Sequence, residues 1–377
     1  MPVSDSHSQD VVIVGGGLAA QRCAEALRRG GFEDRVTIIS NELTAPYDRP
    51  PLSKAFLAGE ADEAEIAFRP EGWHGDQSIE LLLGDAAAGL DPDARTVKLA
   101  SGAEVPYGQL VIATGSRARP LPGAEPYANV HALRSLEDAV RLRAALGPGV
   151  RLVVLGAGLI GQEVAATAHK LGAQVTLVEA APLPLARALH PELAQWLVDL
   201  QRSQGVEVLL GQSVTALTGE GDRLDALCLA DGSRIDLDVL LVGIGVMPNT
   251  EWLPAPVAEL VVRPEIHAAG DVAGGDHWEA AGHQGRTVAR VILGQEPGPA
   301  PVTSWWSDVH GIRLQGLGSP AGTDALEIDG ELAAHAFTAI ATAGGVPRAA
   351  LAVGRPRELP RLRQLLTPTD TNAQEAA

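Results

Sequence analysis

Two stretches of the chain share one pattern: a run of apolar residues, then small residues, then a helix-forming segment. In the first, four apolar β-branched residues at 11–14 run into three glycines, and a helical pattern begins at Leu18. In the second, an apolar run at 151–155 precedes the letters GAGLIG, and the helical pattern that follows closes at Gly172. Each order predicts a buried parallel strand, a tight turn, and a helix whose N-terminus points back over the turn.

The glycines of both turns have the spacing that a bound dinucleotide requires. The first two leave room for a pyrophosphate against backbone N–H groups and the positive end of the helix dipole. A third small residue, Ala20 in the first turn, lets helix and strand pack closely. The candidate binding residues are Gly15, Gly17 and Ala19 in the first turn, and Gly156, Gly158 and Gly161 in the second.

An acidic residue at the tip of the next strand should bind the adenosine ribose. After the strand predicted at 36–39 the acid comes late, so either Asn41 or Glu42 contacts the ribose, or both are polar loop residues. After the strand predicted at 175–178, Glu179 stands directly at the tip. Its carboxylate can accept both ribose hydroxyls of NADH and would repel the 2′-phosphate of NADPH, which predicts a preference for NADH.

Composition narrows the number of domains, the kinds of partner and the kinds of site that the chain can have. The 377 residues suggest two or three domains, and a net charge of −18 argues against nucleic acid or an anionic membrane as the main partner. The N-terminus is polar and has no basic region, which predicts a soluble cytoplasmic protein. The only cysteines, Cys23 and Cys228, form no CxxC or zinc spacing, so we predict no metal site, and each is expected in a core.

The loop PYDRPPLSK at 46–54 makes a family resemblance specific. Following a dinucleotide turn, it resembles the FAD-dependent, NADH-dependent ferredoxin reductases of bacterial cytochrome P450 and ring-hydroxylating dioxygenase systems, which share the glutathione-reductase-like fold. The resemblance implies FAD at the first turn and NADH at the second. It also implies that Lys54 lies against the flavin and pairs with Glu163, in the first turn of the second helix. From the residues alone, Ser53 could cap a helix beginning near Lys54.

Further motifs of that family follow in order along the chain. The resemblance implies that the motifs VIATG, LRSLED, GxGxxPN and AAGDVA contact the cofactors, and that the tryptophan of the WSD motif covers the flavin face away from NADH. Two segments, 249–271 and 271–278, are shorter than the family pattern, and the strand expected near 261–264 looks truncated. The implied cofactor contacts are Arg49, Ala113, Thr114, Gly115, Arg134, Gly245, Asp271 and Trp278, and the implied tryptophan is Trp306 rather than Trp305.

These patterns predict an α/β protein with two Rossmann-like dinucleotide-binding domains and a C-terminal α+β domain. The predicted division is an FAD-binding domain at 1–115 and 241–300, an NAD-binding domain at 116–240, a C-terminal domain at 301–367 and a disordered tail at 368–377. No cysteine lies between Cys23 and Cys228, so the dithiol relay of the disulfide reductases that share this fold has no chemistry to run on.

The leading hypothesis is an oxidoreductase that passes electrons from NADH through FAD to a small iron–sulfur ferredoxin, which supplies an oxygenase. A reductase of rubredoxin, or of a small acceptor such as a quinone, is an alternative of the same fold. A flavoprotein whose NADH-induced state serves binding or regulation is another. Between 343 and 363 there are five arginines and one acid, Glu358. This basic stretch either docks an acidic ferredoxin or forms a solvated helix face.

Overall fold

The computed structural model describes residues 9–275 and 277–367, and this part of the chain divides into two compact units. Each unit has its own sheets and its own core. Within the described ranges, the first unit takes residues 9–48, 63–117, 247–275 and 277–301, and the second unit takes 49–62, 118–246 and 302–367.

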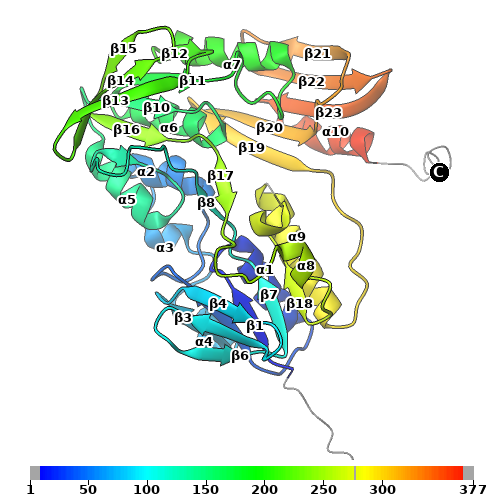
Figure 1. The fold of residues 1–377 in the computed structure, drawn as a ribbon. Helices are drawn as coiled ribbons and strands as arrows, with labels where there is room; N and C mark the ends of the chain where they lie inside the picture. The colour runs from blue at the N-terminus through cyan, green and yellow to red at the C-terminus, as the bar shows by residue number, and fades with distance from the viewer. Residues whose placement is uncertain (1–8, 276, 368–377) are drawn as a thin grey trace, which may run out of the picture. The chain divides into compact units, whose positions relative to one another are not determined.

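A five-stranded parallel sheet with the order β18-β7-β1-β2-β3 forms the centre of the first unit (Figure 1). The central strand pairs in parallel register on both sides, Val12 with Thr37 and with Leu110. Every residue of this strand is buried, as a strand covered on both faces requires. The strands are β1 (Val11–Val14), β2 (Val36–Ser40), β3 (Ile79–Leu83), β7 (Gln109–Ile112) and β18 (Ile266–Ala268).

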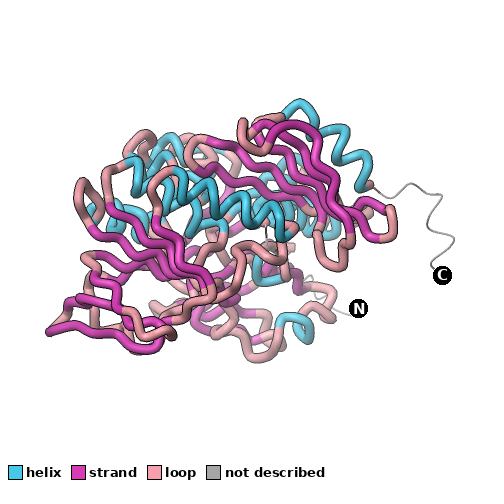
Figure 2. The backbone as a smooth tube through the Cα atoms, turned by 90° about the horizontal axis from the view of Figure 1, so that it is seen from above, coloured by secondary structure: helices cyan, strands magenta, loops and turns pink. Residues whose placement is uncertain are grey.

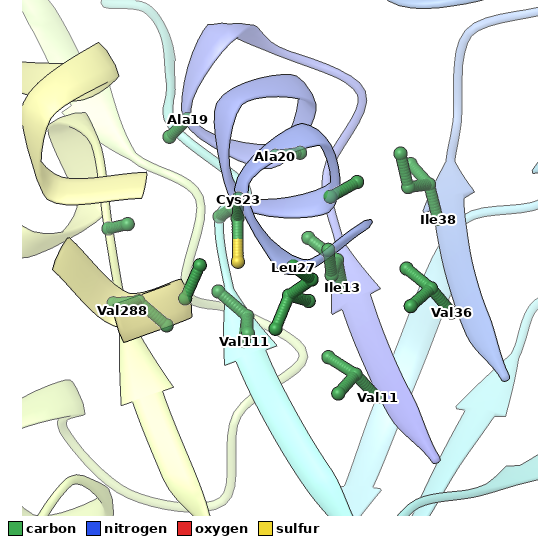
Figure 3. Close-up of a cluster of buried hydrophobic side chains, with 14 of the residues drawn as sticks. Val11, Ile13, Ala19, Ala20, Cys23, Leu27, Val36, Ile38, Val111 and Val288 are labelled. Carbon is green, nitrogen blue, oxygen red and sulfur yellow. The ribbon is translucent and has the colours of Figure 1, made fainter. Parts of the chain in front are cut away.

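Helices α1 (Leu18–Arg29) and α9 (Trp278–Ile292) pack against each other in the first unit. Figure 3 shows Cys23 and Leu27 of α1 pointing into a core that contains Ile13 of β1 and Val111 of β7. Cys23 is fully buried, and burial raises the pKa of its thiol to about 12. The prediction that Cys23 is a small core residue is confirmed.

The first unit also contains a three-stranded antiparallel sheet and several short helices. The sequence predicted only the middle strand of this sheet, because the outer strands are short and mostly half-exposed. In place of the truncated strand predicted near 261–264, the chain turns between a short helix and β18. The elements are β4 (Ala87–Asp91), β5 (Thr96–Leu99), β6 (Glu104–Pro106), α3 (Glu63–Ile66), α4 (Trp73–Asp76), α8 (Val257–Leu260) and the 3₁₀ turn η2 (Asp271–Ala273).

The second unit is built on another five-stranded parallel sheet, in the order β12-β11-β10-β16-β9. Three helices accompany it: α5 (Leu136–Ala145), α6 (Leu159–Lys170) and α7 (Pro191–Ser203). The sequence did not predict α7, although a proline at its first position is a typical helix start. The strands are β9 (Val130–His131), β10 (Arg151–Leu155), β11 (Gln174–Glu179), β12 (Glu207–Leu210) and β16 (Val239–Val242).

An antiparallel meander packs on this parallel sheet through a shared apolar core. Its strands are β13 (Val214–Glu220), β14 (Arg223–Leu229) and β15 (Arg234–Asp236). Cys228 lies on β14 but is only half-buried, so the prediction that it is a core residue is wrong. The alternation along β14 places Leu227 and Leu229 inside and Cys228 between them toward the other face.

The C-terminal segment adds a five-stranded antiparallel sheet in the order β19-β20-β23-β22-β21 (Figure 2). Its core includes residues of α7, and the rings of Trp196 and Phe337 meet edge-on at 5.1 Å between centroids. The elements are β19 (Ser304–Val309), β20 (Ile312–Gly318), β21 (Ala325–Glu331), β22 (Ala336–Ala343), β23 (Val346–Val353), the 3₁₀ turn η3 (Pro356–Glu358) and α10 (Leu359–Leu366).

The chain passes between the units at short segments. Strands β8 (Ser116–Ala118) and β17 (Val246–Pro248) contain two of the passages, and the 3₁₀ turn η1 (Pro50–Ser53) with α2 (Ala55–Ala58) belongs to the second unit. The predicted α/β class with two parallel sheets and a C-terminal α+β part is confirmed. The division into three domains stays a prediction, and the predicted tail at 368–377 lies outside the described residues. Within the described ranges, no helix is long and apolar enough to span a bilayer.

Candidate active site

The first glycine of each turn occupies a position where a side chain cannot fit. Gly15 has φ +126°, and a Cβ there would lie 2.0 Å from the carbonyl oxygen of Ala113. Gly156 has φ +103°, and a Cβ there would lie 2.4 Å from the carbonyl oxygen of Gly243. Both turns therefore bring the strand end, the helix start and a neighbouring strand end into direct backbone contact.

The second glycine of each turn faces open space instead. Apart from its immediate neighbours in the chain, no described atom lies within 4 Å of a Cβ built on Gly17 or on Gly158. These two glycines are the N-caps of α1 and α6, and no described side chain caps either helix. By contrast, α5 begins with a capping box formed by Ser135 and Asp138. The geometry of both turns thus fits a pyrophosphate, whose oxygens would accept from the N–H groups at the helix start.

The third position differs between the turns. A Cβ on Gly161 would lie 2.0 Å from the carbonyl oxygen of Gly156, whereas the first turn holds the fully buried side chain of Ala20 there. The neighbouring candidate, Ala19, packs against α9, because a Cβ on Gly285 would lie 2.2 Å from its carbonyl oxygen. The structure therefore places Ala19 at a helix–helix contact.

The predicted ribose acids are held differently. At the end of β11, the Glu179 carboxylate accepts from the N–H of Ala157 at 2.8 Å and from the N–H of Ala181 at 2.9 Å. It therefore stands beside the open glycine of the second turn. At the end of β2, Ser40 is buried, and Glu42 accepts from the Tyr47 hydroxyl at 2.5 Å. Asn41 is exposed.

Three predicted flavin contacts of the first unit lie on loops that hydrogen bonds hold in place. The Thr114 hydroxyl donates to the carbonyl of Asn249 at 2.8 Å, and the Asn249 amide donates back to the carbonyl of Thr114 at 2.9 Å. The Ser116 hydroxyl donates to Asp271 at 2.6 Å. At the start of α9, the Trp278 indole donates to Asp48 at 2.6 Å. Two flanking candidates share the first loop, the buried Ala113 and Gly115, whose φ is +64°.

In the second unit, three side chains converge on the buried carboxylate of Glu163. The Lys54 ammonium lies 2.8 Å from Oε1 of Glu163, and the Ser307 hydroxyl donates to the same oxygen at 2.7 Å. The Ser53 hydroxyl donates to Oε2 at 2.5 Å. Glu163 and both serines are buried, while 18% of the Lys54 side chain is exposed. The structure thus brings together the Lys54 and Glu163 pair that the sequence predicted, and fixes the carboxylate from three segments.

Two local expectations at this cluster are wrong. The sequence placed Ser53 as a helix cap, but α2 begins after Lys54 and has no side-chain cap, because the Ser53 hydroxyl is directed to Glu163. The sequence also placed Glu163 in the first helical turn. Since α6 begins at Leu159, Glu163 is its fifth residue, so its partners and not the helix dipole account for its position.

Two predicted arginines lie together in the second unit. The Arg49 guanidinium donates to the carbonyl of Arg134 at 2.7 Å, at the start of α5. Both side chains are half-buried. Gly245, the candidate of the GxGxxPN motif, has φ +103° and accepts from the N–H of Arg119 at 2.9 Å.

The two adjacent tryptophans of β19 have different surroundings. Trp305 is 5% exposed and belongs to the core beneath the C-terminal sheet, whereas Trp306 is half-buried on the other face of the strand. The Arg313 guanidinium lies over the Trp306 ring at 5.5 Å from its centroid and pairs with Asp308 at 2.7 Å. The alternation along the strand therefore leaves Trp306, the tryptophan implied by the WSD motif, as the more accessible of the two rings.

Sequence reasoning missed the two serines that bind Glu163 and the arginine over Trp306. No spacing rule identifies a hydroxyl that reaches a carboxylate more than a hundred residues away. Of the two serines, only Ser307 carried a signal, because it lies between Trp306 and Asp308 in the WSD motif. Arg313 could have been found from the hairpin, since it pairs with Asp308 across β19 and β20.

Two dinucleotide folds, each with an uncapped helix start beside an open glycine, define an oxidoreductase that binds two dinucleotides in one chain. Its cysteines cannot serve as a dithiol relay. The chain has only Cys23, whose thiol is buried with a strongly raised pKa, and Cys228 in the other unit.

The chain belongs to the pyridine nucleotide-disulphide oxidoreductase family, whose description matches residues 9–285. Residues 304–377 match the reductase C-terminal domain. Among the similar proteins is a 5,5′-dehydrodivanillate O-demethylase ferredoxin reductase subunit of a Sphingobium species, 37% identical over 88% of this chain and 86% of that protein. A rubredoxin-NAD(+) reductase of Ectopseudomonas oleovorans is 34% identical over 84% of this chain and 89% of its own length.

The fold is also similar to a solved structure, the covalent putidaredoxin reductase–putidaredoxin complex. The reductase is matched with a TM-score of 0.89 and 33% identity over 95% of this chain and 93% of that one. The resemblance stated from the sequence is therefore confirmed. So is the assignment of the chain as an FAD-dependent oxidoreductase that uses a nicotinamide dinucleotide.

Proposed function

We propose that this chain passes electrons from NADH through FAD to a small iron–sulfur ferredoxin, which supplies an oxygenase. The observation that carries the proposal is the pairing of two dinucleotide folds in a chain without a redox cysteine pair. When bound, FAD accepts a hydride from NADH and releases the two electrons singly to a one-electron carrier. The named ferredoxin reductase relatives support the choice of acceptor.

The first turn and its loops would hold FAD. The N–H groups at the start of α1 face the open Gly17 and suit the pyrophosphate. Asp271 is oriented by Ser116 for a hydroxyl of the ribityl chain. Thr114 is held by its hydrogen bond to the carbonyl of Asn249, and its backbone and that of Trp278 would contact the flavin ring. Arg49 and Arg134, which lie together in the second unit, remain FAD contacts implied by the family resemblance.

The second turn would hold NADH. Gly158 leaves room for the pyrophosphate at the start of α6, and Glu179 stands ready to accept the adenosine ribose hydroxyls. A 2′-phosphate would bring negative charge against the Glu179 carboxylate, which supports NADH over NADPH. Gly245, which has no side chain, lets the backbone approach the nicotinamide side.

The Lys54 and Glu163 pair would act on charge beside the flavin. Glu163 is held by Ser53 and Ser307, so its carboxylate keeps one position and holds the Lys54 ammonium in place. A fixed positive charge favours negative charge that develops nearby, and it costs no reorganisation at the moment of reaction. The family resemblance implies Trp306 as the ring that covers a flavin face, and within the second unit the Arg313 guanidinium lies over this ring.

The basic stretch supports docking of an acidic ferredoxin less strongly than its composition suggests. Arg355 pairs with Asp329 at 2.7 Å, and Arg361 pairs with Glu358 at 3.0 Å. These ion pairs neutralise part of the charge locally, so Arg348 and Arg357 are the better candidates for steering a partner.

Rubredoxin is the second candidate acceptor, because a rubredoxin-NAD(+) reductase is similar over most of both chains. Steady-state turnover with purified [2Fe–2S] ferredoxin and with rubredoxin, at equal concentration, separates the two. We expect the ferredoxin to give the larger kcat/KM. A larger value with rubredoxin would replace the acceptor and leave the NADH and FAD assignments intact. We propose a cytoplasmic location for this activity.

The experiment that tests the core of the proposal is an absorption spectrum of the purified protein followed by anaerobic titration with NADH. We expect a yellow protein that is bleached by about one equivalent of NADH. Lys54→Met should retain the yellow colour and slow the bleaching about tenfold or more. A colourless protein that takes up no added FAD would overturn the proposal, and wild-type bleaching rates in Lys54→Met would remove the role of Lys54.

A further inference from the structure

Two buried glutamines link helices α6 and α7 in the second unit. Gln162 is 1% exposed and Gln201 is fully buried. The Gln201 amide nitrogen donates to the side-chain oxygen of Gln162 at 2.7 Å and to the backbone carbonyl of Gln162 at 3.1 Å. The Gln162 amide nitrogen donates to the carbonyl of Ala157 at 3.3 Å, inside the second glycine turn. Two amides in such a place require partners for every donor and acceptor.

The C-terminal sheet supplies the start of this chain of hydrogen bonds. Nε2 of His310 lies 2.8 Å from the side-chain oxygen of Gln201. Because the Gln201 amide nitrogen already donates to Gln162, its oxygen must accept, so Nε2 of His310 carries the proton. Burial, and secondarily the charge of His169, lowers the pKa of His310 to about 4, so the ring is neutral at neutral pH.

His310 reaches Gln201 from a constrained turn. It joins β19 to β20 with φ +51°, a left-handed conformation that side chains other than glycine adopt infrequently, and Gly311 follows with φ +77°. The turn thus directs an imidazole from the C-terminal sheet onto α7. This placement couples a segment outside the dinucleotide fold to the helix that packs beside it.

This series of hydrogen bonds ends at Glu179, the predicted ribose-binding acid. The N–H of Ala157 donates to Oε2 of Glu179 at 2.8 Å. From His310 through Gln201 and Gln162 the donors point the same way, and the last of them reaches the carbonyl of Ala157. The N–H of Ala157 belongs to the preceding peptide group, and its bond to the Glu179 carboxylate is charge-assisted. The two bonds therefore hold residue Ala157 on both sides of its Cα, and the N–H in turn positions the Glu179 carboxylate.

We propose that Gln162, Gln201 and His310 are positioning residues for the nicotinamide dinucleotide. They hold residue Ala157 through its carbonyl, and its N–H holds the Glu179 carboxylate, in the geometry that receives the adenosine ribose. The β19–β20 turn of the C-terminal sheet thereby sets the affinity of the second dinucleotide site. The inference rests on the proposed function in assigning that site to NADH.

The test uses Gln201→Met, which keeps the side-chain length and removes the amide, in the full-length flavoprotein. We expect NAD⁺ binding measured by calorimetry to weaken about tenfold, the scale of one lost buried hydrogen bond. KM for NADH should rise by a similar factor, while kcat at saturating NADH changes less than about twofold. Gln195→Met is the matched control, because Gln195 lies on the exposed face of the same helix and bonds only Asp199 among the described contacts.

A double-mutant cycle distinguishes positioning from general destabilisation. In the Glu179→Ala background, Gln201→Met should have little further effect on NAD⁺ binding, because the end of the series is already gone. His310→Asn tolerates the left-handed turn but is too short to reach Gln201, and should weaken binding about threefold without loss of folding.

The outcomes separate the inference from the proposed function. Full additivity of Gln201→Met with Glu179→Ala, or wild-type NAD⁺ affinity in both Gln201→Met and His310→Asn, would overturn the positioning role alone. A wild-type protein that binds neither NAD⁺ nor NADH would overturn the proposed function together with the inference.

Discussion

The two glycine turns follow one sequence pattern, yet different interactions hold the helices that follow them. Ion pairs hold α1, whereas hydrogen bonds between neutral amides hold α6. Gln21 in α1 and Gln162 in α6 each stand six residues after the first glycine of their turn, and both are buried. Gln21 donates to Glu25 at 2.9 Å and contacts Nε2 of His74 at 2.8 Å. The Arg69 guanidinium lies 2.7 Å from the Glu25 carboxylate, so the interactions that hold α1 include an ion pair. Gln162 instead joins a neutral series of amides.

The next residue along each helix differs as well. Arg22 in α1 pairs with Glu25 of its own helix at 2.8 Å, whereas Glu163 in α6 pairs with Lys54 from a distant loop. In the first turn, therefore, charge stabilises the fold. In the second, the charge at this position pairs with Lys54, which is predicted to lie against the flavin. A motif thus identifies the kind of ligand, but the residues around it decide which side chains are available for reaction.

The largest expected difference concerns the third small position. Gly161→Ala would place a Cβ 2.0 Å from the carbonyl oxygen of Gly156, while Ala20→Gly at the matching position removes only a methyl group from a helix. We expect Gly161→Ala to cost about 3 kcal/mol or more of unfolding free energy, and Ala20→Gly about 1 kcal/mol. Thermal unfolding of the purified proteins measures both.

Gly158→Ala is the control for this prediction, because a Cβ there meets no described atom within 4 Å. It should unfold like the wild type and lose affinity for NADH. Equal unfolding temperatures for Gly161→Ala and Gly158→Ala would contradict the distinction between the packed and the open glycine.

The second largest effect concerns the acids at the strand tips. Glu179→Ala removes a carboxylate that accepts two backbone N–H groups and is predicted to accept the ribose hydroxyls. We expect kcat/KM for NADH to fall about 30-fold to 100-fold, with a much smaller change for NADPH. Glu207→Gln, on the exposed edge of the same sheet, should leave both values unchanged. A uniform loss with both nucleotides would argue against ribose recognition.

The sequence allowed the two βαβ units and their glycines to be predicted, because close backbone approach leaves few choices of residue. Lys54 and Glu163 came from a family resemblance, and the structure pairs them. The residues that orient them were not predictable. Ser53 and Ser307 reach Glu163 only through tertiary contacts, and Gln201 lies on α7, a helix that no predicted element included. Such polar partners are buried among apolar neighbours, so the hydrophobic periodicity of the sequence does not distinguish them from core residues.

The ion pairs of Glu25 in α1 should stabilise the protein less at low pH. Burial alone would raise the pKa of Glu25, but hydrogen bonds from Arg69, Gln21 and Arg22 outweigh it and lower the pKa from 4.5 to about 2. A carboxyl whose pKa is lowered on folding stabilises above its unfolded pKa, and this contribution is lost as the pH falls from 4.5 toward 2.

We therefore expect Glu25→Gln to lower the unfolding free energy by about 2 kcal/mol at pH 7, with a difference from wild type that shrinks below pH 4.5. Thermal unfolding followed by circular dichroism across this range is the measurement. Glu33→Gln, on the exposed turn after α1, should match the wild type at every pH. A difference for Glu25→Gln that stays constant down to pH 2 would show that the stabilisation by Glu25 does not depend on its charge.

The smallest effect is expected at the late acid of the first turn. Glu42 accepts from the Tyr47 hydroxyl and lies two residues beyond the strand tip, where the buried Ser40 replaces the acid of the second turn. In Glu42→Gln the amide oxygen can still accept from Tyr47 and from a ribose hydroxyl, so only the charge-assisted part is lost. We expect the Kd for FAD, measured by fluorescence during reconstitution of the apoprotein, to rise about fivefold or less. Asn41→Ala, at the exposed alternative, provides the comparison. A loss as large as that of Glu179→Ala for NADH would mean that the two turns hold their ribose in the same way despite the displaced acid.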